Sequence, residues 1–264
     1  MHEIADIACN FTSDRFDNDL DEVIDRAIAN HITKFGLICS RLRDIDKLLE
    51  IYNRYSKNMF FTIGVHPHHA NEINAEYLEK LKEVINKNNP HAIGETGLDF
   101  FRNLSTYEEQ MYAFEEQIKI AIDTNKPLFL HQRDSHEDFI KILRKYSSDI
   151  SKAVVHCFTG TQGQLDGYLE LDCYIGVTGW ICDEKRNVEL RKTIKNIPLS
   201  KLMIETDCPY LIPKNLLDKP KNNRNEPSYL NHIVTEISIL LDTDEEDIRK
   251  ESFKNTLSFF QSVN

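Results

Sequence analysis

The sequence contains no closely spaced cysteine pair. Its six cysteines are scattered, and no two of them are separated by only two residues. This spacing argues against a disulfide framework and against a cysteine-rich zinc site, and it is typical of reduced, mostly buried thiols. Long apolar runs are also absent: no stretch approaches the roughly 18 residues of a membrane span, and the first residues, MHEIADIACNF, lack the segments of a signal peptide. We therefore expect a cytoplasmic protein without a membrane segment, and nothing in the sequence indicates an obligate protein partner.

The sequence has fewer basic than acidic residues. Lys and Arg number 32 against 43 Asp and Glu, which gives a formal net charge of −11. A protein that grips duplex DNA along its backbone usually presents a basic face, so extensive sequence-independent DNA wrapping is disfavoured. A phosphodiester that enters a pocket by its end remains compatible with this charge, because a bound divalent cation can be the largest local charge there.

Short β-rich runs alternate with longer amphipathic stretches along all 264 residues. The predicted strands are residues 3–8, 34–39, 59–65, 91–95, 127–131, 152–158, 173–179 and 202–206. The predicted helices are residues 20–31, 43–56, 75–88, 106–125, 135–147, 161–171, 187–197, 228–241 and 244–262. Thr106 with Glu109, and Thr243 with Glu246, have the spacing of a capping box at a helix start.

This alternation predicts parallel strands joined by helical crossovers. Eight such units indicate an α/β fold of the (β/α)₈ TIM-barrel type, in one domain spanning residues 1–264. An open doubly wound sheet is the alternative. Its usual glycine-rich fingerprint, GxGxxG, is not matched by the candidate GETGLD.

Metal-ligating residue types recur where the predicted strands end, which in a barrel is where reactive groups lie. They are His66, His68 and His69 after the third strand, Glu95 at the fourth, His131 at the fifth, His156 at the sixth, and Glu205 and Asp207 at the eighth. Strand side chains alternate between faces, so Glu205 and Asp207 share a side if the extended run continues through both. Each residue alone has an ordinary structural explanation as a hydrogen-bonding, helix-capping or turn residue. Their coincidence at successive strand ends predicts a site for a divalent cation such as Zn²⁺, Mn²⁺ or Mg²⁺.

Other candidates are weaker. His136 is expected to be a solvated helix residue, and Cys157 and Cys208 are expected to be small apolar fillers. The polar loop 213–227 has two interpretations: solvated surface, or a lip that contacts phosphate through basic residues that include Arg224.

Seven motifs, in order, resemble the TatD family of metal-dependent deoxyribonucleases: GVHPH, IGETGLDF, FLHQRDSHEDF, VVHCFTGT, YIGVTGWICDEKR, LMIETDCPYLIP and RNEP. The resemblance covers essentially the whole chain. It implies an amidohydrolase-type barrel, a divalent metal, and hydrolysis of DNA by 3′ to 5′ exonuclease action. Carried onto this sequence, it implies that the metal ligands are Glu95, His131 and His156, with Asp207 as ligand or base, and that His66 and Glu205 complete the active site.

The run DIACNFT departs from the wider family. Ala8 and Asn10 stand where most members have the two histidines of an Asp-x-His-x-His motif. This replacement is typical of the TatD subgroup proper. Because it removes two imidazoles, it favours Mg²⁺ or Mn²⁺ over a tight pair of zinc ions.

We therefore expect metal-assisted phosphodiester hydrolysis acting on single-stranded DNA or DNA ends, with RNA as a further substrate. Asp207 is the expected general base. Glu205 is expected to bind a second ion or to orient a ligand imidazole, and His66 to contact the scissile phosphate or to protonate the leaving oxygen. Two alternatives remain open: a hydrolase of another bond, such as an aminoacyl-tRNA ester or a small amide, and a non-catalytic binding protein derived from the same barrel.

Overall fold

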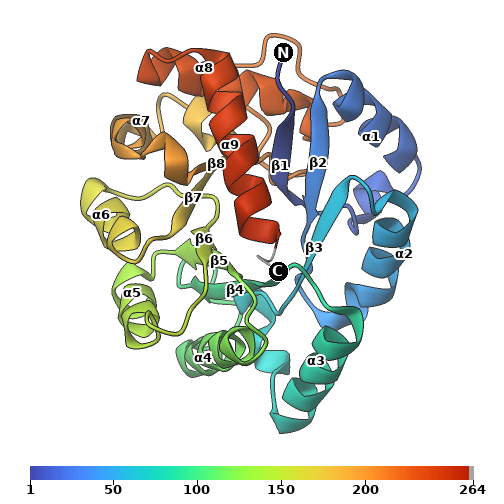
Figure 1. Ribbon diagram of the computed structural model, residues 1–264, viewed down its shortest axis with the longest axis vertical. Helices are drawn as coiled ribbons and strands as arrows, with labels where there is room; N and C mark the ends of the chain where they lie inside the picture. The colour runs from blue at the N-terminus through green and yellow to red at the C-terminus, as the bar shows by residue number, and fades with distance from the viewer. Residues whose placement is uncertain (262–264) are drawn as a thin grey trace.

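A computed structural model of the protein describes residues 1–261. Eight strands form one sheet in the order β1-β2-β3-β4-β5-β6-β7-β8, and every neighbouring pair is parallel (Figure 1). The strands are β1 Ile4–Cys9, β2 Ile32–Leu37, β3 Met59–Ile63, β4 Ala92–Asp99, β5 Leu128–Arg133, β6 Ala153–Val155, β7 Tyr174–Val177 and β8 Leu202–Ile204. A parallel bridge between Cys9 and Cys208 joins β1 to the residues after β8, and the Asn10 amide donates to the Cys208 carbonyl at 2.8 Å. The predicted (β/α)₈ barrel is thus confirmed.

Helices surround the barrel. They are α1 Leu20–Ala29, α2 Ile45–Tyr55, α3 Ala75–Asn88, α4 Tyr107–Asp123, α5 His136–Lys145, α6 Gln162–Glu170, α7 Val188–Thr193, α8 Leu230–Leu241 and α9 Glu245–Phe260. Each lies within the stretch predicted for it. The stretch predicted at 187–197 divides into α7 and the 3₁₀ helix η5 (Ile194–Asn196), and residue 262 of the last predicted helix lies outside the described residues.

The two predicted capping boxes have different outcomes. At α4 the Glu109 amide donates to the Thr106 hydroxyl at 3.3 Å and the Thr106 amide donates to the Glu109 carboxylate at 2.7 Å, as predicted. At α9 the prediction is wrong, because Asp244 is the N-cap and its carboxylate accepts from the Glu246 amide at 2.8 Å. An aspartate one residue further on replaces the threonine, whose hydroxyl instead donates to the Leu241 carbonyl.

Strand β4 is longer than predicted, because it continues past Glu95 to Asp99. Two glycines inside it have left-handed φ values, +145° at Gly94 and +148° at Gly97. A Cβ at Gly94 would lie 2.3 Å from the Phe129 carbonyl oxygen, and one at Gly97 would lie 1.9 Å from the His131 carbonyl oxygen. The glycines are therefore required by the close approach of the β5 backbone.

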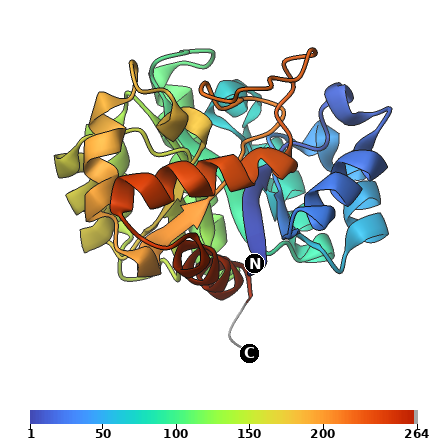
Figure 2. The same ribbon diagram turned by 90° about the horizontal axis from the view of Figure 1, so that it is seen from above.

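The N-terminal end of the barrel is closed by α9. Phe259 and Phe260, each 1% exposed, pack into an apolar cluster with side chains inside the barrel, among them Phe60 and Phe129. The rings of Phe60 and Phe260 stack with centroids 4.8 Å apart. Figures 1 and 2 show α9 crossing this end, beside the start of β1, while the loop between β8 and α8 projects from the opposite edge. In the described residues, no helix is both long and apolar enough to cross a membrane.

Candidate active site

A cavity of about 1080 Å³ opens at the carboxyl end of the strands. Five of the residues that the family resemblance implies for the active site line it together: His66, Glu95, His131, His156 and Asp207; the candidates His68 and His69 also line it. They come from different strands or from the loops that follow them, which is the usual origin of reactive groups in a barrel.

Three imidazoles converge on one oxygen of Glu95. Its Oε1 lies 2.7 Å from His156 Nε2 and 2.9 Å from His131 Nδ1. His66 Nε2 lies 3.3 Å from the same oxygen. The separations of His156 and His131 from Glu95 are close to the roughly 3 Å between adjacent ligands of an octahedral cation with bonds of about 2.1 Å. The donor set therefore fits a divalent cation.

Two further carboxylates orient the histidine rings. Glu205 Oε2 lies 3.5 Å from His156 Nδ1, and within residues 1–261 neither buried atom has a hydrogen-bond partner. Asp99 Oδ2 lies 3.3 Å from His131 Nε2. A carboxylate beside one ring nitrogen favours the proton there and leaves the lone pair on the other. In both rings that other nitrogen is the one that faces Glu95.

His66 has the opposite arrangement. Pro67 begins the 3₁₀ helix η3 (Pro67–Glu72), and His66 is its N-cap, where Nδ1 accepts from the His68 amide at 3.1 Å. The lone pair is thus on Nδ1, and the proton of the neutral ring is on Nε2, pointing at Glu95. Burial lowers the pKa of His66 to about 4, which keeps the ring neutral. His66 is therefore a hydrogen-bond donor to the site.

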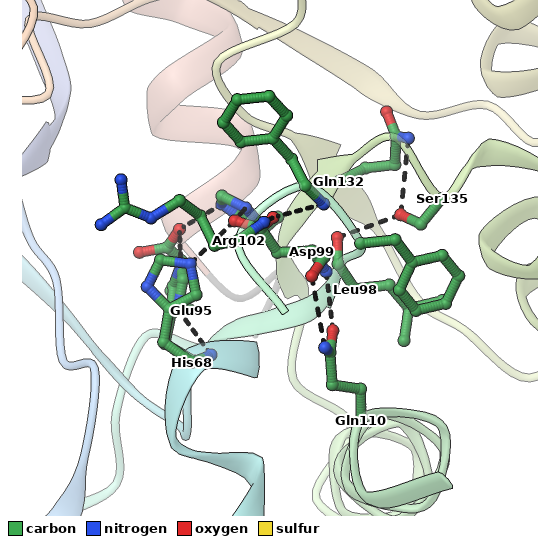
Figure 3. A network of polar contacts seen from close by, with 12 residues as sticks. His68, Glu95, Leu98, Asp99, Arg102, Gln110, Gln132 and Ser135 are labelled. Carbon is green, nitrogen blue, oxygen red and sulfur yellow. Dashed lines mark hydrogen bonds and ion pairs between the residues drawn. The ribbon is translucent and has the colours of Figure 1, made fainter. Parts of the chain in front are cut away.

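Asp99 is a site residue that the sequence prediction missed. Figure 3 shows it at the centre of a polar network. Its carboxylate contacts His68 Nε2 at 2.8 Å and accepts from the amides of Phe101 and Arg102. Gln110 of α4 fixes its backbone, because the side-chain oxygen accepts from the Asp99 amide at 2.8 Å and the nitrogen donates to the Asp99 carbonyl. Asp99 lies four positions after Glu95 and so shares its face, a pattern visible only if the strand continues through the glycines.

Asp207 is held by Asn10, which follows β1, at the seam where β1 meets the residues after β8. Asn10 Nδ2 donates to Asp207 Oδ1 at 2.9 Å and to the Cys208 carbonyl at 3.1 Å. The extended run expected through Glu205 and Asp207 is interrupted, because β8 ends at Ile204 and Asp207 has a φ of +54°. As a result Asp207 faces the cavity, while Glu205 is fully buried behind His156.

The charges of the cluster are set by mutual contacts. Burial opposes ionisation of Glu95, but the nearby imidazoles of His66 and His156 outweigh it and hold its pKa well below the usual range. Burial likewise opposes protonation of His131, yet its hydrogen bonds with Asp99 and Glu95 raise its pKa. Asp207 keeps part of its surface open to the cavity, and the protein packed around it raises its pKa to about 7. The site thus holds an ionised carboxylate, Glu95, that a cation would bind.

Two other expectations have different outcomes. The structure does not bring Arg224 into the cavity: its guanidinium forms two contacts of 2.6 Å with the Asp19 carboxylate and lies over the Phe16 ring. His136 is only partly exposed, and its Nδ1 lies 2.8 Å from the Tyr168 hydroxyl, a contact that was not expected. In both cases the partner is distant in sequence, so the contact could not be predicted from local pattern.

A parallel eight-stranded barrel with histidines and carboxylates at its carboxyl end defines a metal-dependent hydrolase of the (β/α)₈ class. The family model described as TatD related DNase matches residues 5–261. The chain belongs to this family.

Similar proteins support this membership. A "3'-5' ssDNA/RNA exonuclease TatD" from Salmonella typhimurium is 38% identical over 258 residues, covering 98% of this chain and 99% of the relative. A relative of the same name from Escherichia fergusonii is 42% identical over 88% of this chain and 89% of its own. The crystal structure of a TatD family hydrolase from Entamoeba histolytica superimposes with a TM-score of 0.88 at 30% identity, covering 98% of each chain.

Proposed function

We propose that this chain is a divalent-metal-dependent exonuclease that removes nucleotides from the 3′ end of single-stranded DNA and accepts RNA as well. The convergence of three imidazole nitrogens on Glu95 in an open cavity carries the proposal. The relatives named as 3′-5′ ssDNA/RNA exonucleases support its substrate and polarity.

Glu95, His131, His156 and Asp207 would hold the cation. When bound, it supplies Lewis-acid polarisation of a phosphoryl oxygen and acidifies water, whose pKa it lowers from about 15.7 toward about 7. We propose Mg²⁺ or Mn²⁺, with Zn²⁺ as the alternative. The support is that Ala8 and Asn10 offer no imidazole and that the Asn10 side chain instead binds Asp207.

The other side chains accept the proton of water, donate to the phosphate and orient the ligand imidazoles. Asp207 Oδ1 is held by Asn10, which leaves Oδ2 to accept the proton of the attacking water as general base. His66 donates from Nε2 to a phosphoryl oxygen of the scissile group, because its Nδ1 is occupied by the His68 amide. Glu205 and Asp99 keep the rings of His156 and His131 in the orientation that a cation requires.

The test is release of mononucleotides from end-labelled single-stranded DNA, with chelator and with added Mg²⁺, Mn²⁺ or Zn²⁺. We expect metal-dependent release by the wild type, loss of release in His131→Ala, and full release in His232→Ala. His232 is a matched control because it contacts Asn215 on the surface, outside the cavity. A label at the 5′ end should give a ladder of shortening products. Immediate release of a 5′-terminal label would contradict the polarity, and no release with any metal would favour a hydrolase of another bond.

A further inference from the structure

A bulky aromatic side chain at the cavity mouth is exposed to solvent. Phe101, in the loop between β4 and α4, is 57% exposed and lines the same cavity as Glu95. The Arg133 guanidinium lies 3.9 Å from the centroid of its ring. Nucleic-acid bases stack on such rings whatever their sequence, and an arginine beside the ring strengthens the contact.

Two arginines near Phe101 lack a counter-charge: Arg133, whose guanidinium lies over its ring, and Arg102, the next residue in the chain. Among residues 1–261, the side chains of Arg102 and Arg133 have no carboxylate or carbonyl partner. Other arginines at the mouth are paired: Arg41 with Asp44 at 3.2 Å and Arg186 with Asp183 at 3.5 Å. In a protein of net charge −11, this makes one side of the mouth locally available to anions.

The opposite side of the mouth also carries an aromatic residue. Tyr210, in the loop after β8, is 54% exposed and lines the same cavity. Because β4 and β8 are four strands apart in an eight-stranded barrel, their loops face each other across the mouth. The cluster around Glu95 therefore lies between two aromatic platforms, of which only one is accompanied by unpaired arginines.

We propose that Phe101, Arg102 and Arg133 form a subsite for the nucleotides on the 5′ side of the scissile phosphate, and that Tyr210 stacks the 3′-terminal base. The inference rests on the proposed exonuclease function. A terminal nucleotide brings only the scissile phosphate, which the cation site receives. All additional phosphates are on the 5′ side, so the unpaired arginines belong to that side.

Cleavage kinetics on a single-stranded oligonucleotide test the subsite. Because a base that stacks on an aromatic side chain loses that contact in the variant, Phe101→Ala should raise KM about tenfold with little change in kcat. Phe101→Tyr should restore the wild-type KM. Tyr112→Ala is the matched control, since Tyr112 is 47% exposed on α4 but lies outside the cavity lining. Bis(4-nitrophenyl) phosphate has no 5′ nucleotides, so its KM should change in Phe101→Ala only if the whole site is disturbed. An equal rise in KM for this ester and for the oligonucleotide would overturn the proposal.

Salt dependence tests the arginines. Each phosphate contact to a single strand contributes about −0.7 to the slope of log K against log salt concentration. The double variant Arg102→Gln/Arg133→Gln should therefore make that slope shallower by about 1.4, whereas an unchanged slope would contradict the proposal.

Binding of fluorescein-labelled oligothymidylate in chelator, measured by anisotropy, separates this inference from the proposed function. If Phe101→Ala weakens binding but the wild type does not cleave the strand with any of the metals tested, the exonuclease function is wrong and the subsite is supported. If the wild type cleaves while Phe101→Ala keeps the wild-type Kd and KM, the subsite is wrong and the exonuclease function stands.

Discussion

Histidine occurs at both ends of this barrel in opposite surroundings. At the mouth, His131 and His156 face the carboxylate of Glu95. At the closed end, His91 packs against the rings of Phe60 and Phe61, with centroids 5.2 and 5.3 Å away, and its Nδ1 accepts from the Phe61 amide. Contacts with carboxylates raise the pKa of His131 against the effect of burial, whereas burial lowers the pKa of His91 to about 4. The same side chain thus contacts carboxylates at one end of the barrel and aromatic rings at the other, and the two surroundings shift its pKa in opposite directions.

The comparison teaches that polar and apolar functions are separated along the barrel axis. The mouth gathers charges that are only partly compensated, and the closed end gathers aromatic rings from β3 and α9. Activity therefore depends mainly on residues at the carboxyl ends of the strands, and stability mainly on residues at their amino ends. Substitutions at the two ends should change different measured quantities.

The largest effect is expected at the closed end. Replacing Phe260 by Ala leaves a cavity where a ring 1% exposed now stacks on Phe60. The free energy of unfolding should fall by about 3–5 kcal/mol, while kcat at a temperature where the variant is folded should match the wild type. Denaturant unfolding and steady-state kinetics check this. Ile239→Ala, on a side chain that is 69% exposed, is the control and should change stability by less than about 0.5 kcal/mol. A large loss of kcat in folded Phe260→Ala would show that the ends are coupled.

The converse substitution at the mouth is Glu95→Gln. It keeps the shape of the side chain but removes the negative charge on which three imidazoles converge. Mutating a residue that only supports a metal ligand lowers activity by up to about 100-fold. Because Glu95 contacts the cation directly in our proposal, we expect kcat/KM to fall by at least that much. Isothermal titration should show weaker metal binding, and thermal unfolding should show a folded protein. Unchanged turnover at saturating Mg²⁺ would contradict the role of Glu95.

The sequence pattern was sufficient to predict the barrel and the main cluster. Alternation of strands and helices depends on local periodicity, and the strand-end position of Glu95, His131 and His156 follows from it. The supporting contacts were not predictable in this way. The bond from Asn10 to Asp207 joins residues 197 positions apart, and it exists only because the barrel closes β1 against the end of β8.

Asp99 and Arg224 show two further reasons for missed predictions. Asp99 lies beyond the strand predicted at residues 91–95, because the glycines admit the β5 backbone and the strand continues through them. Arg224 was a candidate because loop 213–227 is rich in basic residues. Its pairing with Asp19 depends on the packing of that loop against the residues before α1, which composition does not reveal.

A third test uses pH at the closed end. The folded-state pKa of His91 is about 4, below the value of about 6.5 for an unfolded chain. The unfolded state therefore binds more protons between these values, so the stability contributed by neutral His91 is complete above about pH 6.5 and is lost as the pH falls toward 4. Allowing for partial exposure of the ring, the loss should be about 2 kcal/mol. Unfolding free energies of the wild type and His91→Gln, measured across this range, isolate the contribution of His91 from that of the mouth histidines. A difference that does not vary with pH would contradict the assignment.

The smallest expected effect tests whether a neutral residue at the mouth also serves the reaction. Asn10→Ala removes the hydrogen bond to Asp207 Oδ1 and leaves Glu95, His131 and His156 in place. A hydrogen bond of this kind is worth about 1 kcal/mol, so kcat should fall about fivefold with KM nearly unchanged. Asn30→Ala, which removes an exposed hydrogen bond to the Arg26 carbonyl at the end of α1, away from the cavity, is the control and should keep the wild-type kcat. A fall in thermal stability with an unchanged kcat would show that Asn10 only holds the barrel seam through Cys208, and that Asp207 is positioned by its own loop.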